Sequence, residues 1–127
     1  MKNKEFGRSL ELRTKGFAIE IIKLSATLSN TIEDRIIRNQ IVKSGTSIGA
    51  NYREANKSQS RADFKHKIHI CQGETNETLY WLELILEIKR NNHSKTRLLI
   101  KETKELLALF TSIINKLNTP PNKPQPL

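Results

Sequence analysis

A cluster of basic residues is the part of the sequence best suited to chemistry with another molecule. Between positions 35 and 69 the chain holds eight Lys or Arg residues and only two acids. Lysine and arginine make phosphate contacts that bind nucleic acid without reading its sequence. Five of these cations flank the polar stretch 56–60, which has the composition of a loop, and they form the predicted nucleic-acid-binding site: Arg53, Lys57, Arg61, Lys65 and Lys67. The alternative interpretation is a charged, solvated turn.

An arginine and a histidine five positions apart, Arg61 and His66, raise the alternative of catalysis. This Arg-x4-His string resembles the signature of HEPN ribonucleases, in which a histidine could act as general acid or base near a scissile phosphate. The string is short, and in a basic chain it can arise by chance. We therefore predict no catalytic residue and no enzymatic activity, with a HEPN-like ribonuclease kept as an alternative.

Two glutamates, Glu74 and Glu77, have the spacing of carboxylates in helical-bundle metal sites. Such sites take a Glu-x-x-His pair from each of two helices, and here the second position is a glutamate. Cys71 is the only cysteine, which excludes an internal disulfide and a cysteine-based zinc site within one chain. Its place on an apolar stripe predicts a core residue rather than a nucleophile. We predict neither a metal nor a cofactor.

A row of polar residues runs beside the apolar row of the segment 40–54. A buried polar group without a partner costs about 1–3 kcal/mol, so we expect this row to bind side chains of another helix or subunit and to set its register. Gly45 and Gly49, in the same segment, predict a close approach by a neighbouring backbone. The predicted structural polar network consists of Gln40, Ser47, Asn51, Glu54 and Glu77.

Four amphipathic helices are expected to position these residues. The first begins near Ser9, the second spans 32–55, the third spans 61–90, and the fourth follows a cap at Ser94. Short polar turns join them and no strand-like alternation occurs, so we predict an all-α, antiparallel up-down-up-down four-helix bundle. The bundle domain covers 8–118, between a flexible N-terminus (1–7) and a disordered, proline-rich tail (119–127). The core stripe of the third helix is Phe64, Ile68, Cys71, Thr75, Thr78, Leu82 and Ile85.

Charge and composition indicate the kind of partner and the compartment. The 127-residue chain fits one domain, and its net charge of +9 with a pI of about 9.9 favours polyanions. The sequence shows no apolar run of the signal-peptide type and none near the ~18 residues of a membrane span. We therefore expect a cytoplasmic protein without membrane contact.

A resemblance to a known family lies in three motifs. They are Gln40…Ser-Gly-Thr-Ser-Ile-Gly-Ala-Asn51…Glu54, then Ser60…Phe64, then Glu77-x3-Trp81-Leu-Glu-Leu84. Together they resemble the bacterial four-helix-bundle proteins encoded within intervening sequences of 23S rRNA genes, and they are similar to the accessory variability proteins of diversity-generating retroelements. The resemblance extends over about 8–117. It implies a four-helix protomer that assembles as a ring-like homopentamer, with a basic surface suited to nucleic acid and no established catalytic activity.

The retroelement relatives are associated with a reverse transcriptase and template RNA, so the resemblance also implies a protein partner of that kind. The expected function is a non-enzymatic, homo-oligomeric protein that binds nucleic acid, RNA rather than DNA, through its basic surface. Such a protein could serve as accessory to an RNA-handling enzyme. The alternative is a protein-interaction adaptor whose charge only maintains solubility.

Overall fold

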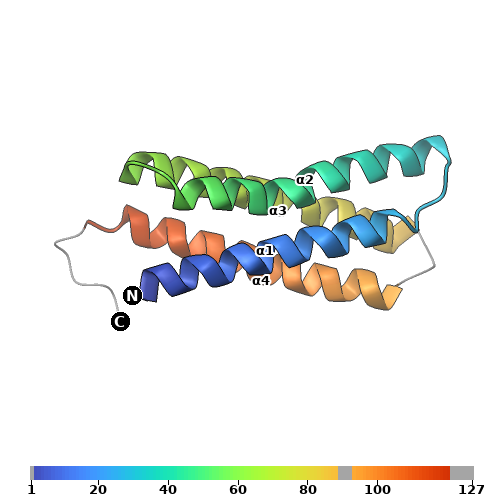
Figure 1. Cartoon of the computed structure of the whole chain (residues 1–127). Coiled ribbons are helices and arrows are strands. Elements are labelled where there is room, and N and C mark those ends of the chain that lie inside the picture. The colour runs from blue at the N-terminus through green and yellow to red at the C-terminus, as the bar shows by residue number, and fades with distance from the viewer. Residues whose placement is uncertain (1, 89–92, 121–127) are drawn as a thin grey trace.

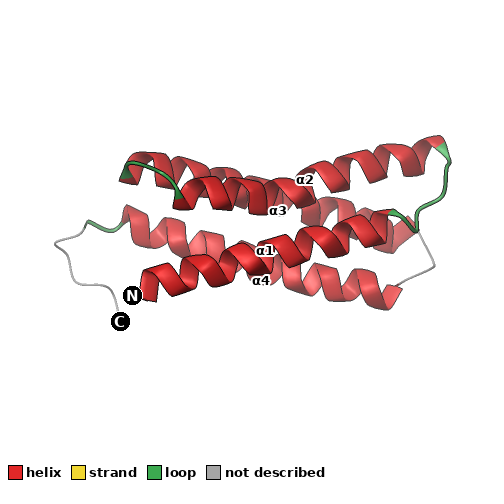
Figure 2. Ribbon diagram, in the orientation of Figure 1, coloured by secondary structure: helices red, strands yellow, loops and turns green. Residues whose placement is uncertain are grey.

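Four long α-helices make up the protein in the computed structural model, which describes residues 2–88 and 93–120, with side chains from Lys4 onward. The helices are α1 (Lys2–Ser25), α2 (Ile32–Asn56), α3 (Arg61–Ile88) and α4 (His93–Asn118). No strand occurs in these two ranges (Figure 2). Successive helices run in opposite directions and α1 lies beside α4 (Figure 1). The predicted antiparallel four-helix bundle is therefore confirmed for the single protomer.

Buried residues at heptad spacing hold the helices together. Alternating steps of three and four residues keep one face of each helix against its neighbours, and side chains then interlock as in a coiled coil. In α3 the buried residues are Ile68, Cys71, Thr75, Thr78, Leu82 and Ile85. The predicted core stripe of this helix is confirmed, except that Phe64 at its start is only half-buried.

The first helix starts earlier than predicted, at Lys2 rather than near Ser9. Gly7 and Leu10 are both buried, and they continue the heptad spacing toward the N-terminus. Because Gly7 has no side chain, α1 packs closely on α2, where the Asn56 amide donates to the Gly7 carbonyl at 3.4 Å. Leu12, although apolar, is 67% exposed. The predicted flexible segment 1–7 is thus helical from residue 2.

The other end of the domain agrees with expectation as far as the structure describes it. Helix α4 ends at Asn118, which is the predicted boundary of the bundle. Most of the predicted disordered tail, 121–127, lies outside the described residues. Among the described helices, none combines the length and apolar character needed to cross a bilayer.

The turn between α1 and α2 is built by side chains that bind backbone groups. The N-cap residue of α2, Thr31, accepts a hydrogen bond from the Asp34 backbone N–H at 3.2 Å. The Arg38 guanidinium donates to three carbonyl oxygens at the end of α1 and in the turn, those of Ser25, Leu28 and Ser29, at 3.2, 2.7 and 2.7 Å. The Ser25 carbonyl also accepts from the Leu28 backbone N–H at 3.1 Å, and carbonyls at a helix end commonly need such partners from outside the helix. Arg38 is therefore a structural cation.

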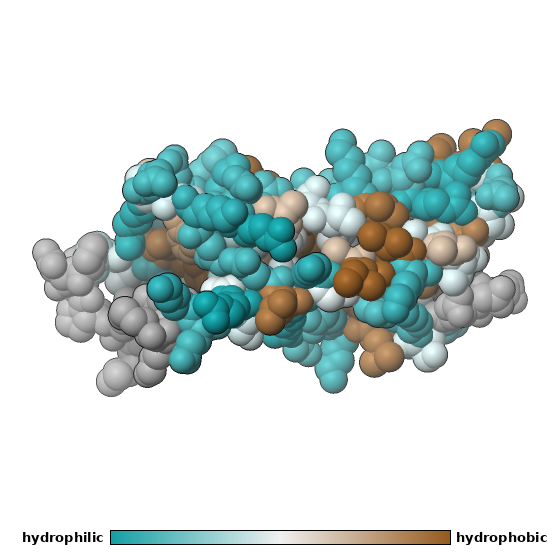
Figure 3. Space-filling view, viewed as in Figure 1, coloured by the Kyte–Doolittle hydropathy of each residue, from teal (hydrophilic) through white to brown (hydrophobic). Residues whose placement is uncertain are grey.

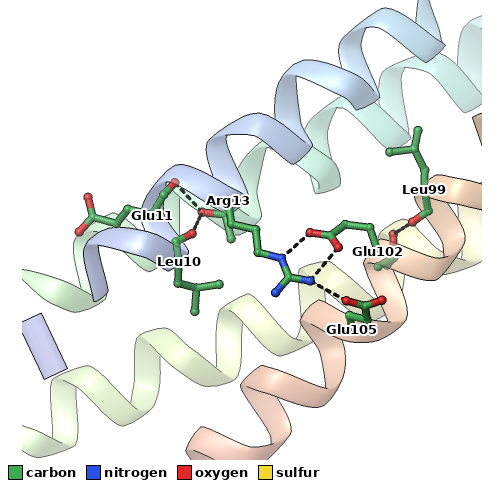
Figure 4. Close-up of polar contacts among 8 residues, drawn as sticks. Leu10, Glu11, Arg13, Leu99, Glu102 and Glu105 are labelled. Carbon is green, nitrogen blue, oxygen red and sulfur yellow. Dashed lines mark hydrogen bonds and ion pairs between the residues drawn. The ribbon is translucent and has the colours of Figure 1, made fainter. Parts of the chain in front are cut away.

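Ion pairs join α1 to α4, the neighbouring pair with the sparsest contact. The Arg13 guanidinium donates from Nε and Nη2 to the two carboxylate oxygens of Glu102, at 2.6 and 2.7 Å. Nη2 also reaches Glu105 at 2.9 Å (Figure 4). These carboxylates raise the pKa of Arg13, chiefly through the hydrogen bond to Glu102. Because the groups are partly exposed, the pair fixes helix register more than it adds stability.

Candidate nucleic-acid interface

The predicted site lies at the end of the bundle where α2 and α3 are joined. The N-terminus of α1 and the C-terminus of α4 lie at the same end (Figure 1, left). The contacts of Asn56 with Gly7 and of Arg61 with the Leu117 carbonyl, the latter at 2.8 Å, bring the four helix termini together. We call this surface the basic end. Side chains that are far apart in the sequence can therefore contact one ligand there.

Four of the five predicted binding residues belong to the basic end. Arg53 and Lys57 are one turn apart at the end of α2, and both are exposed. Arg61 and Lys65 are one turn apart at the start of α3, so they share a face of that helix. Ser60 caps α3 as predicted, accepting from the Asp63 backbone N–H at 3.1 Å.

Lys67 is the predicted binding residue that departs from this arrangement. It lies two positions beyond Lys65, and each residue of a helix turns by about 100°. The two side chains therefore leave α3 in nearly opposite directions. Lys65 and Lys67 are both half-buried, so it is direction and not burial that separates them. The sequence cluster thus supplies four cations that converge and one that points away from them.

The structure adds three exposed cations that the sequence argument did not include: Lys4 and Arg8 on α1, and Lys116 on α4. Lys4 and Arg8 border a hollow that also contains Asn56 of α2. Lys116 lines a cavity together with Arg61. The sequence argument did not place the start of α1 in the bundle, because a glycine such as Gly7 is a weak indication of a core position. The spacing of Gly7 from Leu10 and Thr14 nevertheless marks it as a core position.

Most cations of the basic end remain available to a ligand. Arg53 approaches Glu11 at 4.0 Å, which is the longest ion pair of the bundle. Lys57 and Lys65 form no ion pair within the described residues. By contrast, Arg13 and Lys95 are paired with glutamates at the α1–α4 contact. The structure therefore separates structural cations from free ones.

The predicted polar network does not form between the helices of one protomer. Ser47 donates to the Lys43 carbonyl at 2.6 Å, and Asn51 donates to the Ser47 carbonyl at 2.9 Å, both within α2. Glu77 accepts from the Trp81 indole N–H at 3.2 Å, within α3. The side chains of Gln40 and Glu54 bind no other helix among the described residues. Hydroxyl and amide groups satisfied by their own helix need no partner elsewhere.

A buried polar contact between helices is made by Ser44, a member of the polar row that lies four positions after Gln40 and three before Ser47. The Thr78 hydroxyl donates to the Ser44 hydroxyl at 2.9 Å, joining α3 to α2, and both residues are fully buried. Four other threonines are equally buried, and three of them donate to a carbonyl one turn earlier: Thr14, Thr75 and Thr103. The fourth, Thr96, has a hydroxyl without a partner among the residues that the structure describes. A role of the predicted row between subunits stays a prediction.

The acidic candidates lack the arrangement of a metal site. Burial raises the pKa of Glu74, and repulsion from Glu77 raises it further, while Lys43 lowers it. No group of three or more ligating side chains comes together in the described part of the chain. What the structure places here is a partly buried carboxylate facing a lysine across α2 and α3.

The proposed ribonuclease pair is not assembled within one protomer. Arg61 and His66 are five positions apart on α3, so their side chains leave the helix about 140° apart. Arg61 donates to the Leu117 carbonyl, and His66 is exposed.

Cys71 is fully buried, and burial raises the pKa of its thiol to about 12. This thiol therefore remains protonated at neutral pH, as expected for a core residue.

These features define a class: all-α proteins built as a four-helix bundle with a basic end. Over residues 12–112 the chain matches the 23S rRNA-intervening sequence proteins, and it belongs to that family, as the resemblance indicated. A crystal structure from the S23 ribosomal protein family, of unknown function and from Bacteroides thetaiotaomicron, shares 39% sequence identity. The structural match covers 82% of this chain and 96% of that protein's chain, with a TM-score of 0.75. No curated protein matches the chain.

Proposed function

We propose that the protein is a non-enzymatic, homo-oligomeric binder of nucleic acid, RNA rather than DNA, and an accessory to an RNA-handling enzyme such as a reverse transcriptase. One observation carries the proposal: exposed cations from all four helices gather at the basic end. The preference for RNA is supported by the family's association with 23S rRNA genes in its name. The binding surface consists of Lys4, Arg8, Arg53, Lys57, Arg61, Lys65 and Lys116.

The availability of these cations favours binding of a polyanion. Phosphate contacts by Lys57 and Lys65 break no ion pair of the protein. Each contact releases counterions from the nucleic acid, which stabilises the complex at low salt. Arg13 and Arg38 would have to abandon glutamates or carbonyl oxygens to make the same contact. Binding should therefore concentrate where the cations are free.

The homo-oligomeric part of the proposal is supported by apolar side chains that the protomer leaves exposed. Leu12, Ile19 and Ile22 lie on one side of α1 and are 67%, 44% and 48% exposed. Figure 3 shows apolar surface along the course of α1 on this face. Further copies of the chain would bury it. Light scattering should give five times the monomer mass for the homopentamer implied by the family resemblance, and a monomeric mass would contradict the proposal.

The nucleic-acid part is tested by the salt dependence of binding. A variant with the five sequence-predicted cations changed to glutamine (Arg53, Lys57, Arg61, Lys65 and Lys67) should bind single-stranded RNA more weakly. Each lost phosphate contact lowers the slope of log K against log salt by about 0.7. Because Lys67 points away from the other four, we expect the slope to fall by about 3. Filter binding at several salt concentrations measures it.

A matched control removes the same charge elsewhere. Five exposed cations without ion pairs among the described residues lie outside the basic end: Lys15, Arg35, Arg97, Lys101 and Lys104. Their change to glutamine should leave the slope nearly unaltered. Equal slopes for the two variants would show that net charge alone attracts RNA. Absence of RNA binding by the wild type would instead favour the protein-interaction adaptor, for which the exposed apolar side of α1 is the supporting observation.

A further inference from the structure

A cavity of about 520 Å³ opens at the basic end, between residues of all four helices. Its size falls in the range of small-molecule sites in proteins, about 300–1,000 Å³. In Figure 3 a recess with apolar walls is visible at this end of the molecule. Arg61 and Lys116 of the binding surface belong to its lining, and the other lining residues indicate which ligand it fits.

Aromatic rings form much of the cavity wall. Phe6 of α1 is 43% exposed and Phe64 of α3 is half-buried, although both are large apolar side chains. Tyr52 of α2 lies deeper, at 1% exposure, with its ring 5.9 Å from that of Phe110. The sequence argument treated Phe64 as core and Phe6 as part of a frayed segment. In the folded protein these two rings are available to a ligand.

Polar and charged groups lie among the same lining residues. Arg61 and Lys116 border the cavity, and the bond from Arg61 to the Leu117 carbonyl holds its guanidinium in place. Asn56 also lines the cavity, and its amide nitrogen donates to the Gly7 carbonyl at 3.4 Å and to a Glu11 carboxylate oxygen at 2.7 Å. The cavity therefore combines aromatic walls, two cations and an amide. A bare phosphate would leave the aromatic rings unused, and an uncharged apolar ligand would leave the cations unused.

We infer that this cavity takes up one unpaired base of a single-stranded nucleic acid, with the adjacent phosphate bound by Arg61 and Lys116. The inference rests on the proposed function and deepens it. A base presents a flat π face for stacking on Phe6 or Phe64, which tolerates any sequence. A donor on its edge can reach the side-chain oxygen of Asn56, whose amide nitrogen already donates to Gly7 and Glu11. A base within a duplex cannot enter, so the site selects single strands.

The test compares two fluorescent probes that carry equal numbers of phosphates: a short oligouridylate and an abasic oligomer of the same length. Fluorescence anisotropy should show that the wild-type protein binds oligouridylate about tenfold more tightly, as expected for one stacked base. Phe6→Ala should largely remove this preference while leaving the affinity for the abasic oligomer unchanged. Ser112→Trp, an exposed position on the cavity lining, should remove it by filling the space.

Two further variants keep the result interpretable. Phe64→Leu retains apolar packing but loses the π face, so it should reduce the preference without unfolding the bundle. Leu98→Ala, on α4 away from the cavity and 69% exposed, should keep the full preference. Equal wild-type affinity for the two probes, or a preference that survives Phe6→Ala and Ser112→Trp, overturns the cavity assignment and leaves the proposed function standing. Failure to bind either probe refutes both.

Discussion

Replacing Gly45 with alanine tests how closely α1 and α2 pack. A Cβ atom at position 45 would lie 2.9 Å from Cγ2 of Ile21, and one at Gly49 would lie 3.1 Å from the Thr14 hydroxyl oxygen. The predicted close approach of a neighbouring backbone is confirmed at Gly49, where the Thr14 carbonyl carbon would lie 3.3 Å from the added Cβ atom, whereas at Gly45 the nearest atoms belong to the Ile21 side chain. A Cβ atom at Gly16, which is also helical, would have no atom of another residue within 4 Å. Gly16→Ala is therefore the matched control.

The magnitude follows from two opposing effects. Alanine favours a helix over glycine by about 1 kcal/mol, and at Gly16 this is the whole effect. At Gly45 the added methyl group overpacks the interface, which typically costs about 1–3 kcal/mol. Ile21 is β-branched and fully buried, so it cannot rotate away easily. We expect Gly45→Ala to lower the free energy of unfolding by about 1 kcal/mol, and Gly16→Ala to raise it by about 1 kcal/mol.

Urea unfolding followed by far-ultraviolet circular dichroism measures both variants. The midpoints should move in opposite directions at an unchanged slope, because the surface exposed on unfolding stays the same. Equal stabilisation by the two substitutions would refute the reasoning, since it would show that α1 lies farther from α2 than the structure places it.

Two other predictions concern polar groups inside the bundle. Thr96→Val should raise the free energy of unfolding by about 1 kcal/mol, because the buried Thr96 hydroxyl has no partner among the described residues. Thr103→Val removes a hydroxyl that is bonded to the Leu99 carbonyl, so it should not raise the free energy of unfolding. Urea unfolding measures both variants. Glu74 has a raised pKa in the folded state, so its ionisation costs stability as the pH rises through that pKa. Glu74→Gln should therefore stabilise the protein at neutral pH and not below pH ~4. Thermal unfolding at both pH values measures this, and an equal gain in stability at the two pH values would contradict the prediction.

The fold was predictable because its periodic signal is strong in most helices. In α3 an uninterrupted heptad of apolar and small residues marks the buried face, and that stripe is confirmed. The start of α1 was not predictable from hydrophobicity, because Gly7 and Thr14 occupy core positions while Leu12 is exposed. A prediction based on apolar side chains alone therefore selects the wrong face there.

The candidate site was predictable only in part, since it combines residues from opposite ends of the chain. Arg53, Lys57, Arg61 and Lys65 are close in sequence and flank one loop, so their grouping could be predicted. Lys116 joins them only because α4 returns to the same end. The contacts of the polar row were not predictable for a different reason: within the protomer, side chains such as Ser47 bond to their own helix, and sequence spacing does not distinguish this from a bond to a neighbour.

Mapping where RNA touches the protein tests the central claim most directly. Ultraviolet crosslinking of bound single-stranded RNA, followed by mass spectrometry of the peptides, locates the contacts without any substitution. We expect crosslinks in residues 4–8 and 52–65 and around Lys116, which together form the basic end. Crosslinks confined to residues 32–43 and 93–104, at the opposite end of the bundle, would contradict the account.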